Sequence, residues 1–408
     1  MKKIGIIGAG ASGVFAALFL KQNYIDTTVI ERNANALKKI YATGNGRCNF
    51  TNRNVSYKNY HGENPKFTIS AIKKFDNYDV IEFFNDMGIP EVELENGKIF
   101  PKSLQASSIV KQMMCLANHL EVEFIYDSFV DDVRKNGDVF EVKSNGSLYK
   151  FDYLIIACGS KAYKKSGSDG NGYILMKKLG HNIVKTHPGI VQLRLNGDSF
   201  KKMSGTKFKA NAKLVVDNKE VFEFYHDVLF TDYGISGPTI LQLSGEAIRA
   251  KNKGLDVKIR IDTVDLDENK LYEHLIYIIS LNYYKKINEL LVGLINDNLI
   301  EEVLNQAGIS YDINVCELSK EEIYKLAHTL KNLEFSVSGY KDEDSGQITC
   351  GGVDTDEINP STMESKKIKN LYIIGEIMDV DGDCGGYNLQ WAFSSAYSCA
   401  MSIIKKEN

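Results

Sequence analysis

Three glycines near the N-terminus, Gly8, Gly10 and Gly13, have the spacing that lets a backbone turn hold a phosphate group, and Glu31 follows about twenty residues later. The first glycine permits a tight turn, the second lets the backbone approach a pyrophosphate, and the third allows the following helix to pack closely. The N-terminus of that helix would offer N–H groups to the anion. A carboxylate at position 31 would accept hydrogen bonds from ribose hydroxyls and disfavour a 2′-phosphate, so this half-site suits FAD or NAD rather than NADP.

The elements around these residues agree with that interpretation. Residues 4–7 form a short apolar run typical of a strand, residues 14–20 continue as a helix, and residues 27–30 predict a second strand that ends at the acid. Lys2 and Lys3 before an apolar run also imitate a signal peptide. The complete order of strand, glycine turn, helix and strand favours the dinucleotide-binding unit over a signal peptide or a chance match.

Residues 41–52 are glycine-rich and polar and contain a single arginine, which predicts a loop. That composition suits a segment that holds a phosphate or a ribityl group. An ordinary surface turn explains the segment equally well when it is considered alone.

Further along the chain, helical patterns cover residues 68–87 and 104–120. Short β runs at 121–126, 129–134 and 139–143, with a turn signal at Asn136-Gly137, predict an antiparallel meander. Residues 151–157 form an apolar run too continuous for a half-exposed strand, and they predict a buried parallel strand.

The middle of the chain changes character twice. Short alternating runs between residues 190 and 261 predict a β-rich insertion, and residues 264–333 have Leu, Ile, Glu and Lys at helical spacing. A buried strand at 370–374, a polar loop at 379–388 and a helix at about 389–404 then resume the α/β style of the N-terminus.

The predicted fold class is therefore α/β, with a discontinuous Rossmann-like FAD-binding domain, an inserted β-rich domain and a small helical subdomain. The predicted ranges are 1–189 for the first part of the FAD-binding domain, 190–263 for the β-rich domain, 264–333 for the helical subdomain, 334–346 for a return strand of the β-rich domain, and 347–408 for the second part of the FAD-binding domain.

Composition narrows the function classes. The 408 residues are 43% hydrophobic and 25% charged, which excludes disorder, collagen and coiled coil. A net charge of -4 and no evident basic stripe disfavour nucleic acid, including a tRNA-modifying role, and an anionic membrane. Seven scattered cysteines without a C-x-x-C pair suggest neither disulfides nor metal, so we expect no metal site and a cytoplasmic protein.

Three separated motifs carry a family resemblance. They are TGNGRCNFTN at 43–52, FTDYGISGP at 230–238 and GEIMDVDGDCGGYNLQWA at 375–392. Together with the glycine unit, they resemble the HI0933-like family of bacterial FAD-dependent oxidoreductases, in the glutathione-reductase-like superfamily. That family includes a bile-acid reductase and an aminoacetone oxidase, and the resemblance implies FAD, a three-part architecture and redox chemistry.

The glycine unit, the later motifs and the resemblance together mark a set of expected cofactor-binding residues. By the resemblance, positions 47 and 49 should lie along the cofactor, and positions 375, 379, 386 and 388 should approach the ribityl chain and the isoalloxazine. The full expected set is Gly8, Gly10, Ala11, Ser12, Gly13, Glu31, Arg32, Gly44, Gly46, Arg47, Cys48, Asn49, Ala157, Gly159, Gly375, Glu376, Asp379, Gly385, Gly386, Tyr387 and Asn388.

Two positions depart from the family pattern. Cys158 stands where such strands commonly have Thr, and Cys350 stands before Gly351-Gly352 where a Thr or a small residue is usual. Both changes should preserve packing. The run from Asp383 to Tyr387 is closer to the reductase-like branch than to the aminoacetone oxidase branch, which favours reduction.

The catalytic side chains are not fixed by spacing. Flavin supplies the hydride chemistry, and a proton donor would be needed for an activated alkene. Tyr233, His226, Asp383 and Tyr387 qualify by residue type, and each is also explained as a structural residue. Cys48 or Cys384 could be redox-active, but a small packed residue explains each better without a C-x-x-C partner.

We expect an FAD enzyme that reduces a C=C bond of a small hydrophobic enone, steroid-like by family, with NAD(P)H as the transient electron donor. The segment Gly167–Gly172 lacks a preceding buried strand, so a second nicotinamide-binding domain is not indicated. The alternatives are an amine oxidase that uses oxygen and a flavin-carrying electron-transfer or binding protein. The sequence leaves the oligomeric state open.

Overall fold

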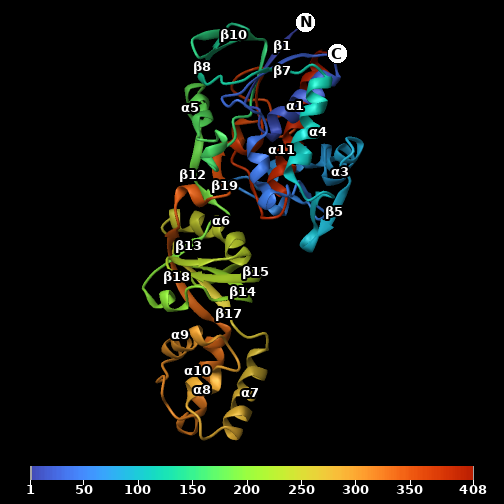
Figure 1. Ribbon diagram of the computed structural model, residues 1–408. Coiled ribbons are helices and arrows are strands. Elements are labelled where there is room, and N and C mark those ends of the chain that lie inside the picture. Colours follow the sequence, from blue (N-terminus) through green and yellow to red (C-terminus); the bar gives the residue numbers. More distant parts are fainter. Residues whose placement is uncertain (1, 408) are drawn as a thin grey trace. The chain divides into compact units, whose positions relative to one another are not determined.

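The computed structural model describes residues 2–407, which form two compact units. One unit comprises Met1–Pro188 and Gln347–Asn408, and the other is Gly189–Gly346. The first unit is therefore built from both ends of the chain, and both termini lie in it (Figure 1). The division of the chain into the five predicted domain ranges stays a prediction.

A parallel sheet of five strands forms the centre of the first unit, in the order β20-β11-β1-β2-β7. The strands are β1 (Lys3–Ile7), β2 (Asp26–Ile30), β7 (Glu123–Ile125), β11 (Tyr153–Ile156) and β20 (Leu371–Ile373). Their apolar residues are covered on both faces, which explains the continuous hydrophobic runs at β1, β11 and β20. The predicted α/β class with a Rossmann-like sheet is confirmed.

Two helices from opposite ends of the chain pack against each other beside this sheet. They are α1 (Ala11–Gln22) and α11 (Tyr387–Glu407), shown in blue and red in Figure 1. Phe15 of α1 contacts Phe393 of α11 with ring centroids 4.8 Å apart, and Phe19 contacts Tyr397 at 5.1 Å. This packing brings the N-terminal glycine turn and the C-terminal motif into one unit.

The predicted antiparallel meander is wrong for its first strand. Residues 121–126 contain β7, which pairs in parallel with β2 at the edge of the central sheet. The meander consists instead of β8 (Val130–Asn136), β9 (Val139–Ser144) and β10 (Ser147–Phe151). A short β run carries no signal for the direction of its partner, so its local pattern did not distinguish the two sheets.

The predicted helix at 68–87 is two helices, α2 (Ile69–Lys74) and α3 (Asn77–Asp86). Asp76 separates them because its side chain accepts hydrogen bonds from the backbone N–H groups of Tyr78 and Asp79 and so begins a new helix. The remaining elements of this unit are α4 (Ala106–His119), α5 (Asn171–Lys178), β3 (Thr51–Asn52), β4 (Tyr60–His61), β5 (Glu91–Leu94), β6 (Lys98–Pro101), β12 (Ile183–Gly189), β19 (Ile348–Val353) and β21 (Asp381–Gly382).

The second unit contains a closed barrel in the order β13-β16-β15-β14-β17-β18. Its strands are β13 (Leu193–Leu195), β14 (Lys207–Val216), β15 (Lys219–Thr231), β16 (Gly234–Ser236), β17 (Val257–Asp262) and β18 (Leu333–Tyr340). Buried apolar side chains such as Leu214, Phe230 and Ile259 form its core. The β-rich insertion predicted from the sequence also contains a helix, α6 (Pro238–Asn252), that was not predicted. This helix packs on β14 and β15.

Four helices occupy the segment for which the sequence predicts a helical subdomain. They are α7 (Glu268–Leu281), α8 (Ile287–Leu291), α9 (Asp297–Ala307) and α10 (Lys320–Lys331). Apolar residues on α7, α9 and α10 are buried, including Leu275, Val303 and Leu326. The leucine and isoleucine pattern of this segment therefore serves packing, whereas Tyr277, Tyr283 and Tyr284 are exposed.

Candidate functional site

The glycine turn between β1 and α1 leaves the N-terminus of α1 open. Gly10 is the N-cap residue, no side chain caps the helix, and a Cβ at Gly10 would meet no atom within 4 Å. Gly8 and Gly13 are closely packed by contrast, because a Cβ at Gly8 would lie 2.5 Å from the Ala157 carbonyl oxygen. A Cβ at Gly13 would lie 2.0 Å from the Gly8 oxygen. The three glycines thus have different roles, and only Gly10 faces free space.

Glu31 lies at the end of β2 and holds this turn in place. Its Oε2 accepts the Ala9 N–H at 2.8 Å, and its Oε1 accepts the backbone N–H and side-chain amide of Asn33 at 2.8 and 2.7 Å. The carboxylate is only 7% exposed. A carboxylate offers about four acceptor positions, so the three bonds leave room for about one more donor. The contact between Glu31 and a ribose stays a prediction.

Arg32 and Gly159 both contact the loop that precedes α5. Arg32 pairs with Asp169 at 2.6 Å and donates to the Gly167 carbonyl oxygen at 3.1 Å. Gly159 has a φ of +69°, and a Cβ there would lie 2.6 Å from Ser168 Oγ. These contacts place residues 166–170 beside the carboxyl ends of β2 and β11.

The loop at 43–49 is partly a 3-10 helix, Lys38–Gly46, that breaks at Thr43, Gly44 and Asn45. Arg47 is exposed and lies over the Phe100 ring at 5.0 Å. Asn49 is buried and donates its amide to the carbonyl oxygens of Thr51 and Ile99, both at 2.8 Å. Asn49 therefore fixes the backbone of this loop, whereas Gly46 and Arg47 lie on its exposed side.

The late strand β20 leads into Gly375 beside α1. A Cβ at Gly375 would lie 2.5 Å from Ser12 Oγ, so this glycine lets the two segments meet. Glu376 forms an ion pair with Lys39 at 2.6 Å, which joins this motif to the 3-10 segment. Asp379 is buried, and its Oδ2 accepts the Glu63 N–H at 2.8 Å.

The motif before α11 packs on the loop around β3. Gly386 has a φ of +98°, and a Cβ there would lie 2.2 Å from the Thr51 carbonyl oxygen. The Gly385 carbonyl oxygen accepts from Asn52 Nδ2 at 3.0 Å. The Asn388 side chain closes the motif, since its amide group exchanges two bonds of 2.8 Å with the backbone of Gly382. The helix begins at Tyr387, two residues earlier than predicted, so its first N–H groups follow the paired glycines directly.

The structure adds residues that sequence analysis did not select. His61 Nε2 lies 2.8 Å from Asp383 Oδ1, and Asn59 Nδ2 donates to Asp383 Oδ2 at 3.1 Å. Thr51 Oγ1 also donates to Gln390 Oε1 at 2.5 Å, inside the unit. These pairs join residues more than 300 positions apart, and no local pattern in the sequence marks them.

The cysteines of the motifs are unsuited to act as thiolates. Burial raises the pKa of the Cys48 thiol from 9.0 to about 12, although a hydrogen bond with Thr43 opposes the shift. Burial also raises the pKa of Cys384, and that of Cys158 to about 12. Each thiol therefore stays protonated near neutral pH.

The proposed acids fall in both units. Asp383 and Tyr387 belong to the first unit, where burial followed by the Asp383 charge raises the pKa of Tyr387 to about 12. Tyr233 and His226 belong to the second unit. Tyr233 lies beneath Lys341 at 5.0 Å, and His226 Nδ1 accepts the Asp227 N–H at 2.7 Å.

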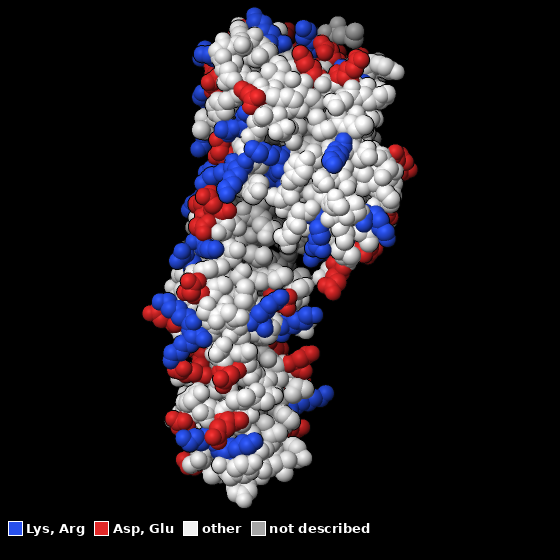
Figure 2. Space-filling model, viewed as in Figure 1, with Lys and Arg blue, Asp and Glu red and all other residues white. Residues whose placement is uncertain are grey.

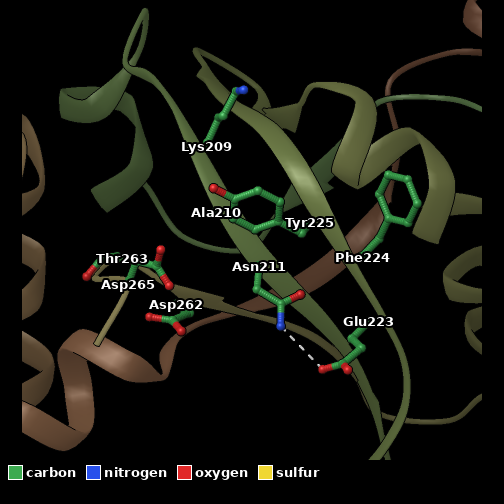
Figure 3. A pocket seen from close by; sticks show the side chains of 9 residues that line it. All are labelled: Lys209, Ala210, Asn211, Glu223, Phe224, Tyr225, Asp262, Thr263 and Asp265. Atoms are coloured by element: carbon green, nitrogen blue, oxygen red, sulfur yellow. Dashed lines mark hydrogen bonds between the residues drawn. The ribbon is translucent and has the colours of Figure 1, made fainter. Parts of the chain in front are cut away.

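A cavity of about 420 Å³ lies on the outside of the barrel (Figure 3). Its lining is mostly polar, and Asn211 donates to Glu223 across it at 3.3 Å. The lining residues are Lys209, Ala210, Asn211, Glu223, Phe224, Tyr225, Asp262, Thr263 and Asp265. A hydrophobic ligand requires a predominantly apolar pocket, so this cavity does not suit a steroid-like molecule.

Within residues 2–407, no three or more His, Cys, Asp or Glu side chains converge as metal ligands would. Across the same residues, the helices lack the combination of length and apolar character needed to cross a bilayer.

An uncapped helix N-terminus beside a parallel sheet, with an acid at the end of the second strand, defines a dinucleotide-binding unit of the Rossmann-like class. The family model described as the HI0933-like protein Rossmann domain matches residues 2–402. The chain belongs to this family of flavoproteins and is an FAD-dependent oxidoreductase.

Three similar proteins extend over the whole chain. The 3-dehydro-bile acid delta(4,6)-reductase of Clostridium scindens is 32% identical, with 100% of both chains covered. The ribosomal RNA dihydrouridine synthase of Escherichia coli is 32% identical over 98% of this chain and 97% of its own. The solved structure of 3-ketosteroid delta1-dehydrogenase from Sterolibacterium denitrificans has a TM-score of 0.50 at 11% identity, with 99% of each chain covered, and shows a shared fold.

The residues at the glycine turn fit the cofactor of this family. A pyrophosphate needs unpaired N–H donors and room for close approach, and the α1 N-terminus with Gly10 provides both. The remaining acceptor position of Glu31 suits one hydroxyl of an adenosine ribose.

Proposed function

We propose that this protein reduces a C=C bond conjugated to a carbonyl group in a small hydrophobic molecule, with steroid-like enones as substrates and NAD(P)H as the electron donor. The observation that carries this proposal is the full-length similarity to a reductase named for bile-acid double bonds. The run from Asp383 to Tyr387 before α11 also favours the reductase branch.

FAD supplies hydride transfer, and the residues of the chain bind it and orient the second reactant. In this proposal, Gly10 and the N–H groups of Ala11 and Ser12 hold the pyrophosphate, and the close packing at Gly8 and Gly13 shapes the turn around it. The end of β2, with Glu31 and Arg32, lies beside the adenosine. Gly375 and the motif before α11 lie toward the ribityl chain and the ring system.

The start of α11 also has an electrostatic role in this proposal. A helix N-terminus carries a partial positive charge, and the N–H groups after Gly386 have no acceptor within the helix. They would stabilise negative charge that develops on the flavin N1 and C2 oxygen. A reduction potential that stays unchanged when Asn388 is substituted would contradict this role.

The electron donor has no dedicated domain in this proposal. Gly172 packs against the segments that follow β11 and β20, since a Cβ there would lie 2.8 Å from Cys158 Cβ and 2.7 Å from Ile377 Cδ1. That segment therefore supports the fold. NADH or NADPH would reach the flavin by the same route as the substrate.

A second candidate is reduction of a uracil base in ribosomal RNA, where the C5=C6 bond is likewise conjugated to a carbonyl. A relative named for this reaction is as similar in sequence as the bile-acid reductase, at 32% identity. Residues 161–185 contain six lysines and one aspartate, which departs from the expectation of no basic cluster. Figure 2 shows Lys and Arg gathered where Figure 1 places α5 and β12. Such a cluster could contact RNA phosphates.

The test is an anaerobic titration of the FAD-loaded protein with NADH and then NADPH, followed by addition of an acceptor. Rapid bleaching of the flavin, followed by recovery of colour with a 4-ene-3-ketosteroid, supports the main proposal. Recovery only with a uridine-containing ribosomal RNA fragment supports the second candidate. A flavin that stays oxidised with both nucleotides contradicts the nicotinamide donor, and reduction by an amine would support the oxidase alternative.

A further inference from the structure

Two segments that lie far apart in the sequence form a histidine–carboxylate pair in the first unit. Strands β4 and β21 pair in antiparallel fashion, with His61 opposite Asp381. Two residues further on, Asp383 Oδ1 lies 2.8 Å from His61 Nε2. Both segments therefore fix the geometry of the pair through their backbones.

The carboxylate of this pair is held on both oxygens. Asn59 Nδ2 donates to Asp383 Oδ2 at 3.1 Å, and the Asp383 N–H donates to the Asn59 carbonyl oxygen at 2.9 Å. Asp383 is thus anchored independently of its bond to His61. Because the carboxylate is fixed, it can in turn fix the orientation of the imidazole ring.

The pair lies against the motif that the proposed function places at the flavin. Asp383 is two residues before Gly385, which precedes the start of α11. On the other segment, a Cβ at Gly62 would lie 2.5 Å from the Asp379 carbonyl oxygen. The side chain of His61 is 22% exposed to solvent, and that of Asp383 is 14% exposed. The imidazole is therefore held within the motif but stays accessible to a small molecule.

We propose that His61, held by Asp383, is the catalytic acid that protonates the substrate carbon next to the carbonyl group. This inference rests on the proposed reductase function. The substrate receives a hydride at its β-carbon from the reduced cofactor, which NAD(P)H regenerates. At His61, the Nδ1–H bond of the imidazolium breaks and a C–H bond forms at the α-carbon, while Nε2–H stays directed at Asp383. The C=C bond is thereby reduced by two electrons, and a neutral imidazole remains to take a proton from solvent.

The residue types suit this assignment better than the acids considered from the sequence. Histidine is the side chain that ordinarily exchanges a proton near neutral pH, and a neighbouring carboxylate stabilises its charged form. The hydroxyl of Tyr387, with its pKa raised to about 12, is a much weaker acid. The other titratable groups on the segments packed here are Tyr60, Glu63, Asp379, Asp381 and Cys384, and Cys350 Sγ lies 3.4 Å from Asp381 Oδ2.

The experiment compares His61→Gln and Asp383→Asn with the wild-type holoenzyme, and uses His328→Gln as a matched control. His328 forms a similar pair with Glu268 at 3.0 Å, but in the helical segment of the second unit. Stopped-flow absorbance measures flavin reduction by NAD(P)H and reoxidation by a 4-ene-3-ketosteroid separately. We expect reoxidation by the steroid to slow by about 10²–10⁴-fold in His61→Gln, with flavin reduction changed much less. The control should match the wild type in both steps.

A second measurement tests the role of Asp383 as a positioning residue without turnover. Nitrogen NMR of selectively labelled histidine should show His61 with Nε2 protonated in the wild type and with a mixture of tautomers in Asp383→Asn. The wild-type reoxidation rate should fall as the pH rises and His61 loses its proton. That dependence should be absent in His61→Gln.

The possible failures are distinguishable. Equal reoxidation rates in His61→Gln and the wild type would overturn the assignment of His61 while leaving the reductase function intact. A wild-type enzyme that NAD(P)H reduces but that no enone reoxidises would overturn the proposed function, and this inference with it. If both steps slow equally in His61→Gln, the role of His61 is structural and the inference is also overturned.

Discussion

Substituting alanine for Gly10 tests the cofactor site separately from the stability of the fold. The backbone at Gly10 has φ -78° and ψ -172°, which an L-residue adopts without strain. The new Cβ would meet no atom within 4 Å. Alanine lowers the conformational entropy of the unfolded chain, which stabilises the folded variant by about 0.4–1 kcal/mol. Alanine is also a poorer N-cap residue than glycine, which costs a similar amount. The free energy of unfolding should therefore change by less than about 1 kcal/mol.

FAD affinity should respond very differently. The Cβ would occupy the space through which a pyrophosphate approaches the N–H groups of α1, and each charge-assisted hydrogen bond lost costs about 1.5–3 kcal/mol. Losing one such bond corresponds to an increase in Kd of about 10- to 100-fold. Urea unfolding of the apoprotein measures the stability, and quenching of FAD fluorescence measures the Kd.

Two further substitutions control for the effect of a new methyl group. Gly293→Ala places a Cβ in open space in the second unit and should change neither stability nor FAD affinity. Gly13→Ala brings a Cβ within 2.0 Å of the Gly8 oxygen and should destabilise the protein by about 3 kcal/mol. An unchanged Kd in a folded Gly10→Ala variant would refute the assignment of this turn to the pyrophosphate.

Three other predictions follow from local contacts. Gly386→Ala places an alanine at a positive φ with its Cβ 2.2 Å from the Thr51 oxygen. The free energy of unfolding, measured by chemical denaturation, should therefore fall by about 2 kcal/mol or more. Glu31→Gln replaces a carboxylate that accepts three N–H bonds by an amide that also donates. The free energy of unfolding should fall by about 1–3 kcal/mol, and FAD should bind more weakly. A variant in which both quantities are unchanged would contradict the role of this carboxylate. Burial raises the pKa of Cys48 to about 12, so the folded protein favours the neutral thiol. As the pH rises from 9 toward 12, the free energy of unfolding should therefore fall by up to about 1.4 kcal/mol per pH unit. This slope should be shallower in Cys48→Ala, and alkylation at pH 8 should modify the exposed Cys115 but not Cys48 in the folded protein.

The parts of the fold that sequence analysis predicted are those fixed by local chemistry. The turn at Gly8 must have a positive φ, here +103°, and the helix and strands that follow are contiguous with it. Strands β11 and β20 were predictable because a strand covered on both faces is apolar at every position. The positions expected to bind the cofactor stay a prediction, although the structure brings Gly375 against Ser12 and Gly13 against Gly8.

The parts that were missed depend on which segment lies next to which. Strand β7 has the same local pattern whether it joins the meander or the parallel sheet, and only its pairing with β2 distinguishes them. The helix α6 lies in a stretch otherwise rich in β runs. The place of Asn49 along the cofactor stays a prediction, and its amide donates to two backbone carbonyl groups. Side-chain amides serve either purpose, so the residue type alone does not decide between them.

The same distinction explains why His61 was overlooked and why Asp383 has gained a defined role. A lone histidine in a polar stretch is usually structural, and Asp383 alone is one of several acids in its motif. Their chemistry arises only because β4 pairs with β21 and aligns both side chains. The family motif therefore supplies the carboxylate, whereas a two-residue strand more than 300 positions earlier supplies the proton donor. If the bond partner of Asp383 sets the protonation step, we expect relatives that reduce different conjugated C=C bonds to retain this pair and to differ where the rest of the substrate is bound.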